Sequence, residues 1–196
     1  ISNKDEKDNP INLLSGVETF NKKNSLNAVV EISKGQTHKW EVSKLTGKLH
    51  REFWMGIPRK VDSSPYPINY GMIPRTILPL KFGGDGDPVD AILLGEQVPR
   101  GSIIQGKIIG VMKMRDMDEN DDKIILTSKN SVLNKYKNIQ DLGKDNPKIL
   151  SDLKTWFTNY KKNNFVEFIR YGSEEEAYNL VLKASKHYKR LGIKIK

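Results

Sequence analysis

Short runs of apolar and β-branched residues recur along the chain between turn-forming residues. Such runs, bounded by Gly, Pro, Asn and Asp, are typical of strands. They predict strands at residues 26–32, 37–42, 89–95, 102–114, 123–127 and 165–171. The segment 43–84 is rich in Pro, Gly and Ser, which predicts long loops with short strands. Several short strands with turns between them favour a barrel or a sandwich.

A first amphipathic helix is predicted at residues 147–162. Asn146 can cap this helix and Pro147 suits its first position. The spacing of the apolar residues predicts one buried stripe, formed by Ile149, Leu150, Leu153, Trp156, Phe157 and Tyr160.

A second helix is predicted at residues 174–191. Ser173 and Glu176 have the spacing of a capping box, and Gly192 is expected to end the helix. The positions expected to face the core are Ala177, Leu180, Val181, Ala184, Tyr188 and Leu191. Together these elements predict a mainly β fold with α-helices, in which a small β-barrel carries two flanking helices.

The length of 196 residues suits a single domain, and 37% hydrophobic residues suffice for one core. Residues 1–25 are polar with little periodicity, so we expect a loosely held N-terminal arm before one domain at 26–196. No stretch approaches the ~20 apolar residues of a membrane helix, and no secretory signal is visible. We expect a cytoplasmic protein that binds no membrane. An exported protein is the alternative, because the chain starts at Ile1.

Composition excludes several kinds of site. The chain has no cysteine, so disulfides, zinc–thiolate centres and thiol nucleophiles are ruled out. Its three histidines form no HExxH pair. The formal net charge of +9 is compatible with nucleic-acid binding, with a pocket for a small polyanion, or with a lysine-rich surface. Charge alone does not choose among these three.

The most informative segment is the turn at residues 83–90, which holds Asp85, Asp87 and Asp90. Carboxylates this close repel one another unless a cation lies between them, and a hard divalent ion prefers such oxygen ligands. An isolated acidic turn is more often simply solvated. An EF-hand calcium loop is a poor match, because Asp90 occupies the position that requires glycine.

A second acidic cluster, residues 116–122, follows one strand later. Alone, it predicts a hairpin loop with solvated charges. The strands on either side of it, 102–114 and 123–127, could bring it to the same barrel mouth as the first cluster. Carboxylates gathered around two or more metal ions are typical of phosphoryl transfer to water.

These motifs, taken in order along residues 26–171, resemble the family I soluble inorganic pyrophosphatases. Residues 85–90 match the signature D-x-D-P-x-D, and residues 66–71 match Y-P-x-N-Y-G. The other matching residues are Glu31, the pair Lys39 and Glu41, the stretch 110–116, the stretch 121–123, and the pair Tyr160 and Lys161. The resemblance implies an OB-like five-stranded β-barrel with flanking helices.

The resemblance also implies a reaction, in which a metal-activated water attacks magnesium pyrophosphate directly and releases two orthophosphates. Mg²⁺ would be held by Asp85, Asp90, Asp116 and Asp121, and Asp87 would accept the proton of the water. Outer-shell water would be ordered by Glu31 and Glu41. Substrate would be bound by Lys39, Arg59, Tyr66, Tyr70, Lys123, Tyr160 and Lys161. The compact length implies a homo-oligomer, with a hexamer favoured.

The sequence departs from the family pattern at the phosphate-binding arginine. The family position, eight residues before Tyr66, is Pro58 here, and residues 54–58 look like an insertion. Arg59 lies one residue off this register, and Pro58 stiffens the approach to it. Arg51 lies on the other side of the insertion. We therefore favour Arg59 over Arg51.

An OB-type nucleic-acid binder is the alternative from another class of protein. It would account for the barrel and for the charge of +9. It requires stacked aromatic residues on a basic face, whereas the barrel segments here carry acidic clusters. We therefore expect no nucleic-acid partner.

Overall fold

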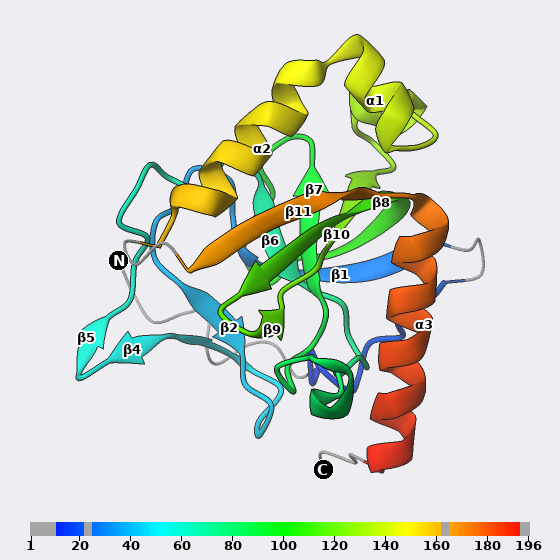
Figure 1. Ribbon diagram of the computed structural model, residues 1–196. Helices are drawn as coiled ribbons and strands as arrows, with labels where there is room; N and C mark the ends of the chain where they lie inside the picture. Colours follow the sequence, from blue (N-terminus) through cyan, green and yellow to red (C-terminus); the bar gives the residue numbers. More distant parts are fainter. Residues whose placement is uncertain (1–10, 22–24, 162–164, 193–196) are drawn as a thin grey trace.

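The structure is a computed structural model that describes residues 11–21, 25–161 and 165–192. Five strands form a closed ring through hydrogen-bonded pairing (Figure 1). In ring order they are β1 (Leu26–Ile32), β6 (Asn69–Met72), β7 (Asp90–Leu94), β10 (Lys123–Ser128) and β8 (Ile103–Asp116), with β8 pairing back to β1. All pairs are antiparallel except β7 and β10. The predicted mainly β, OB-like arrangement with five ring strands is confirmed.

The ring closes tightly where β1 crosses β6. A Cβ atom on Gly71 would lie 1.8 Å from the carbonyl oxygen of Val29, so only glycine allows the two strands to approach this closely. The long strand β8 pairs with β1 near its start, with β10 along its middle and with β11 (Val166–Gly172) near its end. Ile109, Met112 and Met114 of β8 are fully buried.

Helix α2 (Pro147–Asn159) covers one end of the ring (Figure 1). Leu153, Trp156 and Phe157 are buried as predicted, and Pro147 occupies the first turn. The predicted cap is wrong, because the Asn146 side chain makes no bond to the helix. Its amide instead donates to the Tyr136 hydroxyl at 2.5 Å. A short helix α1 (Ile139–Asp145), which the apolar pattern did not predict, comes just before and starts at a capping Asn138.

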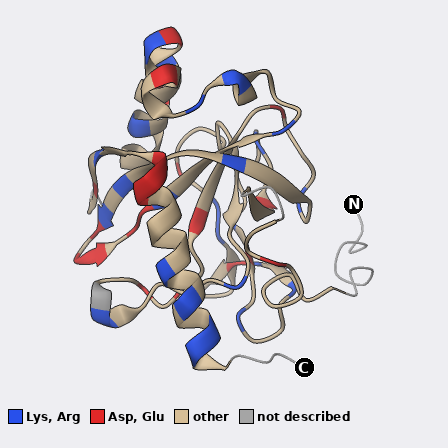
Figure 2. Ribbon diagram, turned by 90° about the vertical axis from the view of Figure 1, so that its right-hand side faces the viewer, with Lys and Arg blue, Asp and Glu red and all other residues tan. Residues whose placement is uncertain are grey.

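Helix α3 (Glu174–Leu191) packs against β8, and its predicted capping box is present. Ser173 Oγ accepts from the Glu176 amide at 3.2 Å, and the Glu176 carboxylate accepts from the Ser173 amide at 2.9 Å. Figure 2 shows the acidic first turn and the basic last turns, which complement the helix dipole. The core prediction for Leu191 is wrong. This residue is 50% exposed, because the helix runs past the edge of the sheet (Figure 1).

Residues 11–21 are firmly packed, although composition predicted a loose arm. Leu13 and Leu14 are 2% and 1% exposed and join a cluster with Val29, Met72 and Tyr188. The Leu13 amide donates to the Gly47 carbonyl at 2.8 Å. Two adjacent leucines in a polar segment are too short to show a period, so their burial depends on a groove that only the folded chain provides.

The segment 43–84 contains two small hairpins. The first pairs β2 (Trp40–Val42) with β3 (Leu49–Arg51), so β2 is shorter than the predicted strand 37–42. The second pairs β4 (Phe53–Trp54) with β5 (Ile57–Pro58) and projects from the ring (Figure 1). Three other short elements are η1 (Leu80–Phe82), β9 (Glu119–Asn120) and η2 (Val132–Lys135). Within the described ranges, no helix has the length and hydropathy needed to cross a membrane.

Candidate active site

Strand pairing brings the two acidic segments together. In the parallel pair β7–β10, Lys123 lies opposite Asp90, so the first residues of both strands are neighbours. Strand β8 ends at Asp116 and turns through β9 before β10 begins, so the second cluster forms the predicted hairpin loop. Asp85 and Asp87 precede β7 on the Gly-rich turn. Asp90 and Asp121, which are 31 positions apart in the chain, therefore share one end of the ring.

Lys123 links Asp90 of the first cluster to Asp121 of the second. Its ammonium group is 2.8 Å from Asp90 Oδ2 and 2.6 Å from Asp121 Oδ1, and its side chain is 1% exposed. Burial acts to lower the pKa of Lys123, but the charges of Asp121 and Asp90 outweigh it and hold the pKa well above the ordinary value. Tyr70 Oη donates to Asp90 at 2.6 Å. Although burial acts to raise the pKa of Asp90, the contacts of Lys123 and Tyr70 lower it.

Asp85 carries negative charge that its neighbours do not neutralise. Burial first, and then the charges of Asp87, Asp90 and Asp121, raise the pKa of Asp85 to about 6. The hydrogen bond from the Asp87 amide, at 2.8 Å, opposes this only partly. Burial also raises the pKa of Asp121. A cluster of hard oxygen donors under mutual repulsion fits a divalent cation.

The carboxylates do not converge into a finished metal cage. Within residues 11–21, 25–161 and 165–192, no group of three or more acidic or imidazole side chains is arranged to hold an ion. Lysines neutralise the predicted ligands instead. Lys123 binds Asp90 and Asp121, and Lys161 forms an ion pair with Asp116. The carboxylates fit a divalent metal by their chemistry. Such an ion would compete with the ammonium groups of Lys123 and Lys161 for these carboxylates, or bind beside them.

Asp87 lies at the exposed rim of this cluster, with 53% of its side chain exposed. It forms an ion pair with Lys44, whose ammonium group also donates to the Gly86 carbonyl at 3.3 Å. Sequence reasoning did not select Lys44. Its only signal is a position three residues after Glu41, in the turn of the β2–β3 hairpin, and a solvated lysine there is unremarkable.

Aromatic side chains form the wall behind the carboxylates. Tyr160 stacks on Trp156 at 5.2 Å, and Tyr66 lies 4.4 Å from Trp156 and 5.5 Å from Tyr70. Tyr66 is only 2% exposed, and its burial raises the pKa of its hydroxyl. Burial raises the pKa of Tyr160 as well. Both hydroxyls are therefore protonated at neutral pH and available as hydrogen-bond donors.

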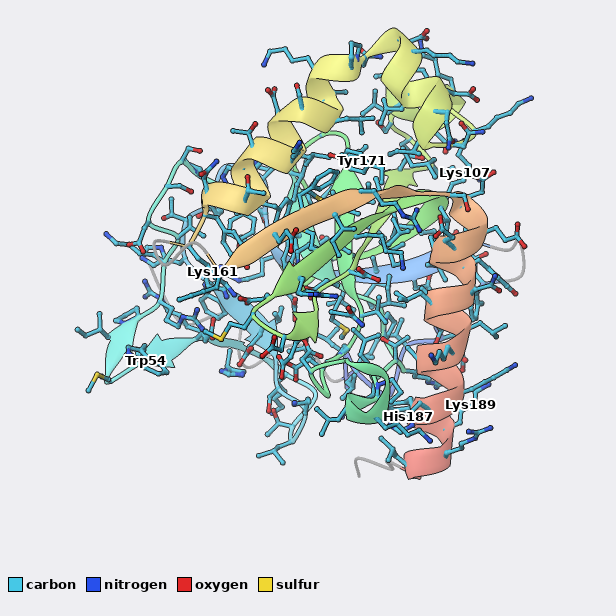
Figure 3. The ribbon with its side chains drawn as sticks, viewed as in Figure 1. Trp54, Lys107, Lys161, Tyr171, His187 and Lys189 are labelled. Atoms are coloured by element: carbon cyan, nitrogen blue, oxygen red, sulfur yellow. The ribbon has the colours of Figure 1, made fainter. Side chains whose placement is uncertain are left out.

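A cleft of about 880 Å³ opens beside this wall. Its basic residues are Lys39, Arg59, Lys60 and Lys161, and its lining also includes Trp54, Asp116 and Tyr160. Figure 3 labels Lys161 beside the ring and Trp54 on the projecting β4–β5 hairpin. Burial, together with the nearby charges of Arg59 and Lys161, lowers the pKa of Lys39. Four carboxylates, those of Asp62, Asp116, Asp118 and Glu119, also line the cleft, so it brings basic and acidic side chains together.

The two candidate arginines lie in different places. Arg59 lines the cleft with Lys39, whereas Arg51 lines a separate pocket. Glu52, which sequence reasoning missed, holds both cleft cations. It forms an ion pair with Arg59 and lies 3.4 Å from Lys39 Nζ. The two-residue period of a strand would have found it, since Glu52 and His50 share one face of the hairpin.

The two predicted outer-shell glutamates differ in setting. Glu31 is 7% exposed and accepts from the Val42 amide at 2.7 Å, and its burial raises its pKa well above the ordinary value. Glu41 is half-exposed and lies 3.2 Å from His50 Nε2. Asp122, also in the second cluster, points away from the site. It accepts from Lys113 at 2.9 Å and from the Met114 amide at 3.1 Å, which fixes the hairpin.

Comparison with known proteins adds independent information. The family model described as inorganic pyrophosphatase matches residues 28–189. A soluble inorganic pyrophosphatase of Zea mays is 38% identical over 139 residues, which are 70% of this chain and 59% of the relative. An inorganic pyrophosphatase of Corynebacterium glutamicum is 33% identical over 171 residues, which are 84% of this chain and 99% of the relative.

Solved structures show the same fold. The inorganic pyrophosphatase of Schistosoma japonicum superimposes with a TM-score of 0.86 at 25% identity, over 91% of this chain and 71% of that one. The enzyme of Helicobacter pylori does so with a TM-score of 0.74 at 31% identity, over 88% and 98%. The chain spans less than two thirds of the plant relatives it matches, and nearly the whole of some bacterial ones.

Proposed function

Because the chain belongs to the inorganic pyrophosphatase family, we propose that it hydrolyses inorganic pyrophosphate to two orthophosphates. The observation that carries this proposal is the meeting of Asp85, Asp90 and Asp121 at one end of the ring, beside a cleft lined by Lys39, Arg59 and Lys161. Pyrophosphate is a compact polyanion that chelates divalent cations. Carboxylates beside the basic side chains of the cleft suit both parts of such a substrate.

The basic residues of the cleft would bind the two phosphate groups. Arg59 offers a planar fork of donors, while Lys39 and Lys161 act as point charges. Glu52 keeps Lys39 and Arg59 together at the wall of the cleft. Tyr160, whose hydroxyl stays protonated, would donate a hydrogen bond to a phosphate oxygen, whereas Tyr70 donates to Asp90. These contacts neutralise the charge that builds up on the leaving phosphate.

Asp85, Asp90, Asp116 and Asp121 would hold the divalent metal on which the family depends, with Mg²⁺ proposed here. When bound, such a cation lowers the pKa of water and neutralises phosphate charge. Asp87, at the open rim, would accept the proton of the attacking water. Its exposure leaves room for that water, and its ion pair with Lys44 positions the carboxylate at the rim.

Three finer proposals accompany the activity. Assembly into a homo-oligomer, with a hexamer favoured, rests on the compact length of the chain. Residence in the cytoplasm is supported by the similarity to relatives described as soluble inorganic pyrophosphatases. The division into an N-terminal segment at 1–25, whose residues 11–21 pack on the core, and one domain at 26–196 rests on composition.

The direct test is phosphate release from pyrophosphate by the purified chain. We expect turnover with Mg²⁺, its loss in a chelator, and inhibition by Ca²⁺, whose longer and looser coordination misplaces the reacting groups. An Asp90→Asn variant serves as the matched control for a contaminating phosphatase, and we expect it to be inactive. Full activity after exhaustive metal removal, or no activity with any divalent cation, would contradict the proposal.

A further inference from the structure

The β2–β3 hairpin has two chemically distinct faces. Trp40 pairs with Arg51 across the hairpin, so these two side chains lie on the same face. Lys39 and Glu52 occupy the alternate positions and form an ion pair on the other face, at the catalytic cleft. Arg51 is therefore turned away from the cleft by the pleat of its own strand.

A second cavity, of about 410 Å³, lies on the Trp40 face. Its polar lining consists of Ser33, Gln36, His38, Arg51 and Arg100. Trp40 and Ile32 supply the apolar part of the wall. Among the described residues, no carboxylate lines this cavity, so its ionisable groups are all basic. A cavity of this composition favours an anion over a cation or a neutral ligand.

One donor in this cavity lacks a partner. The Nε atom of Arg51 is shielded from solvent, and no hydrogen-bond acceptor reaches it from the described part of the chain. A buried donor left unpaired destabilises the folded state. Such groups are rare in native proteins and call for an explanation, of which a missing ligand is one. An oxyanion would supply the acceptor.

The side chains around Arg51 also favour an anion in this cavity. The guanidinium of Arg100 lies 3.7 Å from the centre of the Trp40 ring, which holds it over the aromatic face. Burial first, and then the charges of Arg51 and Lys60, lower the pKa of His38. The neutral imidazole is consistent with a positive local potential. Two guanidinium groups from separate segments of the chain thus face one small volume.

We propose that this cavity binds a small oxyanion of the phosphate class, at a site separate from the catalytic cleft. Arg51 and Arg100 would bind its oxygens, because the planar guanidinium matches the spacing of phosphate oxygens. Ser33 and Gln36 are placed to add hydrogen bonds. The proposal does not depend on pyrophosphate hydrolysis. The cavity and the cleft lie on opposite faces of the same hairpin, which carries Arg51 on one face and Lys39 and Glu52 on the other.

The test is an NMR titration of the whole, metal-free chain with inorganic phosphate. We expect saturable shifts of the Trp40 indole N–H and the Arg51 Nε–H signals, assigned through Trp40→Phe and Arg51→Met. Arg51→Met and Arg100→Met should each weaken the phosphate affinity at the Trp40 signal by about tenfold or more. Arg190→Met, which removes an exposed arginine near the end of α3, should leave it unchanged. Arg59→Met should also leave it unchanged, because Arg59 lines the other cavity.

Two parallel titrations distinguish the possible sources of the anion. Inorganic phosphate tests a free oxyanion, and a nucleoside monophosphate tests a phosphate carried on a larger ligand. Saturation by either one, lost in Arg100→Met, supports the site. Circular dichroism of each variant shows that it is folded, and Arg100→Met tests the site even if Arg51→Met does not fold. Phosphate shifts that vanish in Arg59→Met but persist in Arg51→Met and Arg100→Met would overturn the proposal. The absence of any saturable shift at Trp40 would overturn it as well.

Discussion

At the scale of residues, one buried lysine joins the two acidic segments of the chain. Lys123 bonds both Asp90 and Asp121, and its charge holds these two partly buried carboxylates close together. A buried ammonium with two carboxylate partners satisfies the rule that buried charges are paired. The carboxylates outside its reach, above all Asp85, keep the unbalanced charge that a cation would neutralise.

The proposed role of Asp87 predicts a specific kinetic effect. Asp87→Asn keeps the size of the side chain but removes its ability to accept a proton, so turnover should fall by roughly 10²–10⁴-fold. Asp87 lies at the rim, ion-paired with Lys44 rather than with Lys123. Affinity for Mg²⁺ should therefore largely survive. Steady-state kinetics over a range of Mg²⁺ concentrations measure both quantities. Weaker metal binding with normal turnover at saturating Mg²⁺ would make Asp87 a ligand instead.

The placement of the two arginines predicts different kinetic effects. Arg59→Ala should severely weaken pyrophosphate binding and turnover, because Arg59 lines the cleft beside Lys39. Arg51→Ala, the matched control, should change either by less than about threefold, near 0.6 kcal/mol, because its side chain lies on the opposite face of the hairpin. Steady-state kinetics of both variants, measured at saturating Mg²⁺ and low phosphate, show which arginine contacts the substrate. The reverse order would mean that Arg51 supplies the phosphate contact.

At the scale of elements, helix α3 shows how local sequence rules set a boundary. Ser173 and Glu176 bond reciprocally, Gly192 takes the left-handed conformation that ends the helix, and charges of the favourable sign occupy both ends. In α2, by contrast, Asn146 is drawn to Tyr136 and makes no cap. A side chain with a tertiary partner in reach does not follow the local rule.

The capping box of α3 predicts a measurable loss of stability on substitution. Ser173→Ala removes the acceptor for the Glu176 amide and should lower the free energy of unfolding by about 1 kcal/mol. For a chain of this size that corresponds to roughly 2–4 °C in Tm. Ser151→Ala in the exposed middle of α2 is the control and should not destabilise. Equal melting of both variants would show that the cap contributes nothing.

At the scale of the whole molecule, the acidic cluster makes stability depend on pH and metal. The pKa of Asp85 is about 6 in the folded chain, whereas an unfolded Asp titrates near ~3.9. Between these values the folded state binds more protons than the unfolded state, so its stability falls as pH rises. Above about pH 6 this loss is complete. A bound divalent cation would reverse it.

The corresponding prediction compares Asp85→Asn with the wild-type chain in a chelator. The variant cannot ionise, so its stability relative to wild type should grow as the pH rises from 4 to 6 and then level off. Urea unfolding at several pH values measures this difference, and Asp118→Asn, at an exposed position in the β8–β9 turn, is the control. Added Mg²⁺ should reduce the advantage of the variant. A difference that shrinks with rising pH would contradict the burial and repulsion assigned to Asp85.

What the sequence determined by itself is local in origin. The strand β1, the ring strands β7, β8 and β10, and helix α3 follow from side-chain periods of 2 and 3.6, and these periods act over a few neighbouring residues. The carboxylates of residues 85–90 are close because they are near neighbours along the chain, so the sequence alone predicts an acidic cluster there.

Only the tertiary structure decided which distant side chains meet. The pairing of β7 with β10 sets Lys123 beside Asp90, and the pairing of β2 with β3 sets Arg51 beside Trp40. The burial of Leu13 and Leu14 likewise depends on strands that lie far along the chain. Pairing register and groove shape arise from the packing of the whole core, and a one-residue shift in a strand would exchange its faces. For this reason no local pattern reveals that Arg59 lines one cavity and Arg51 another.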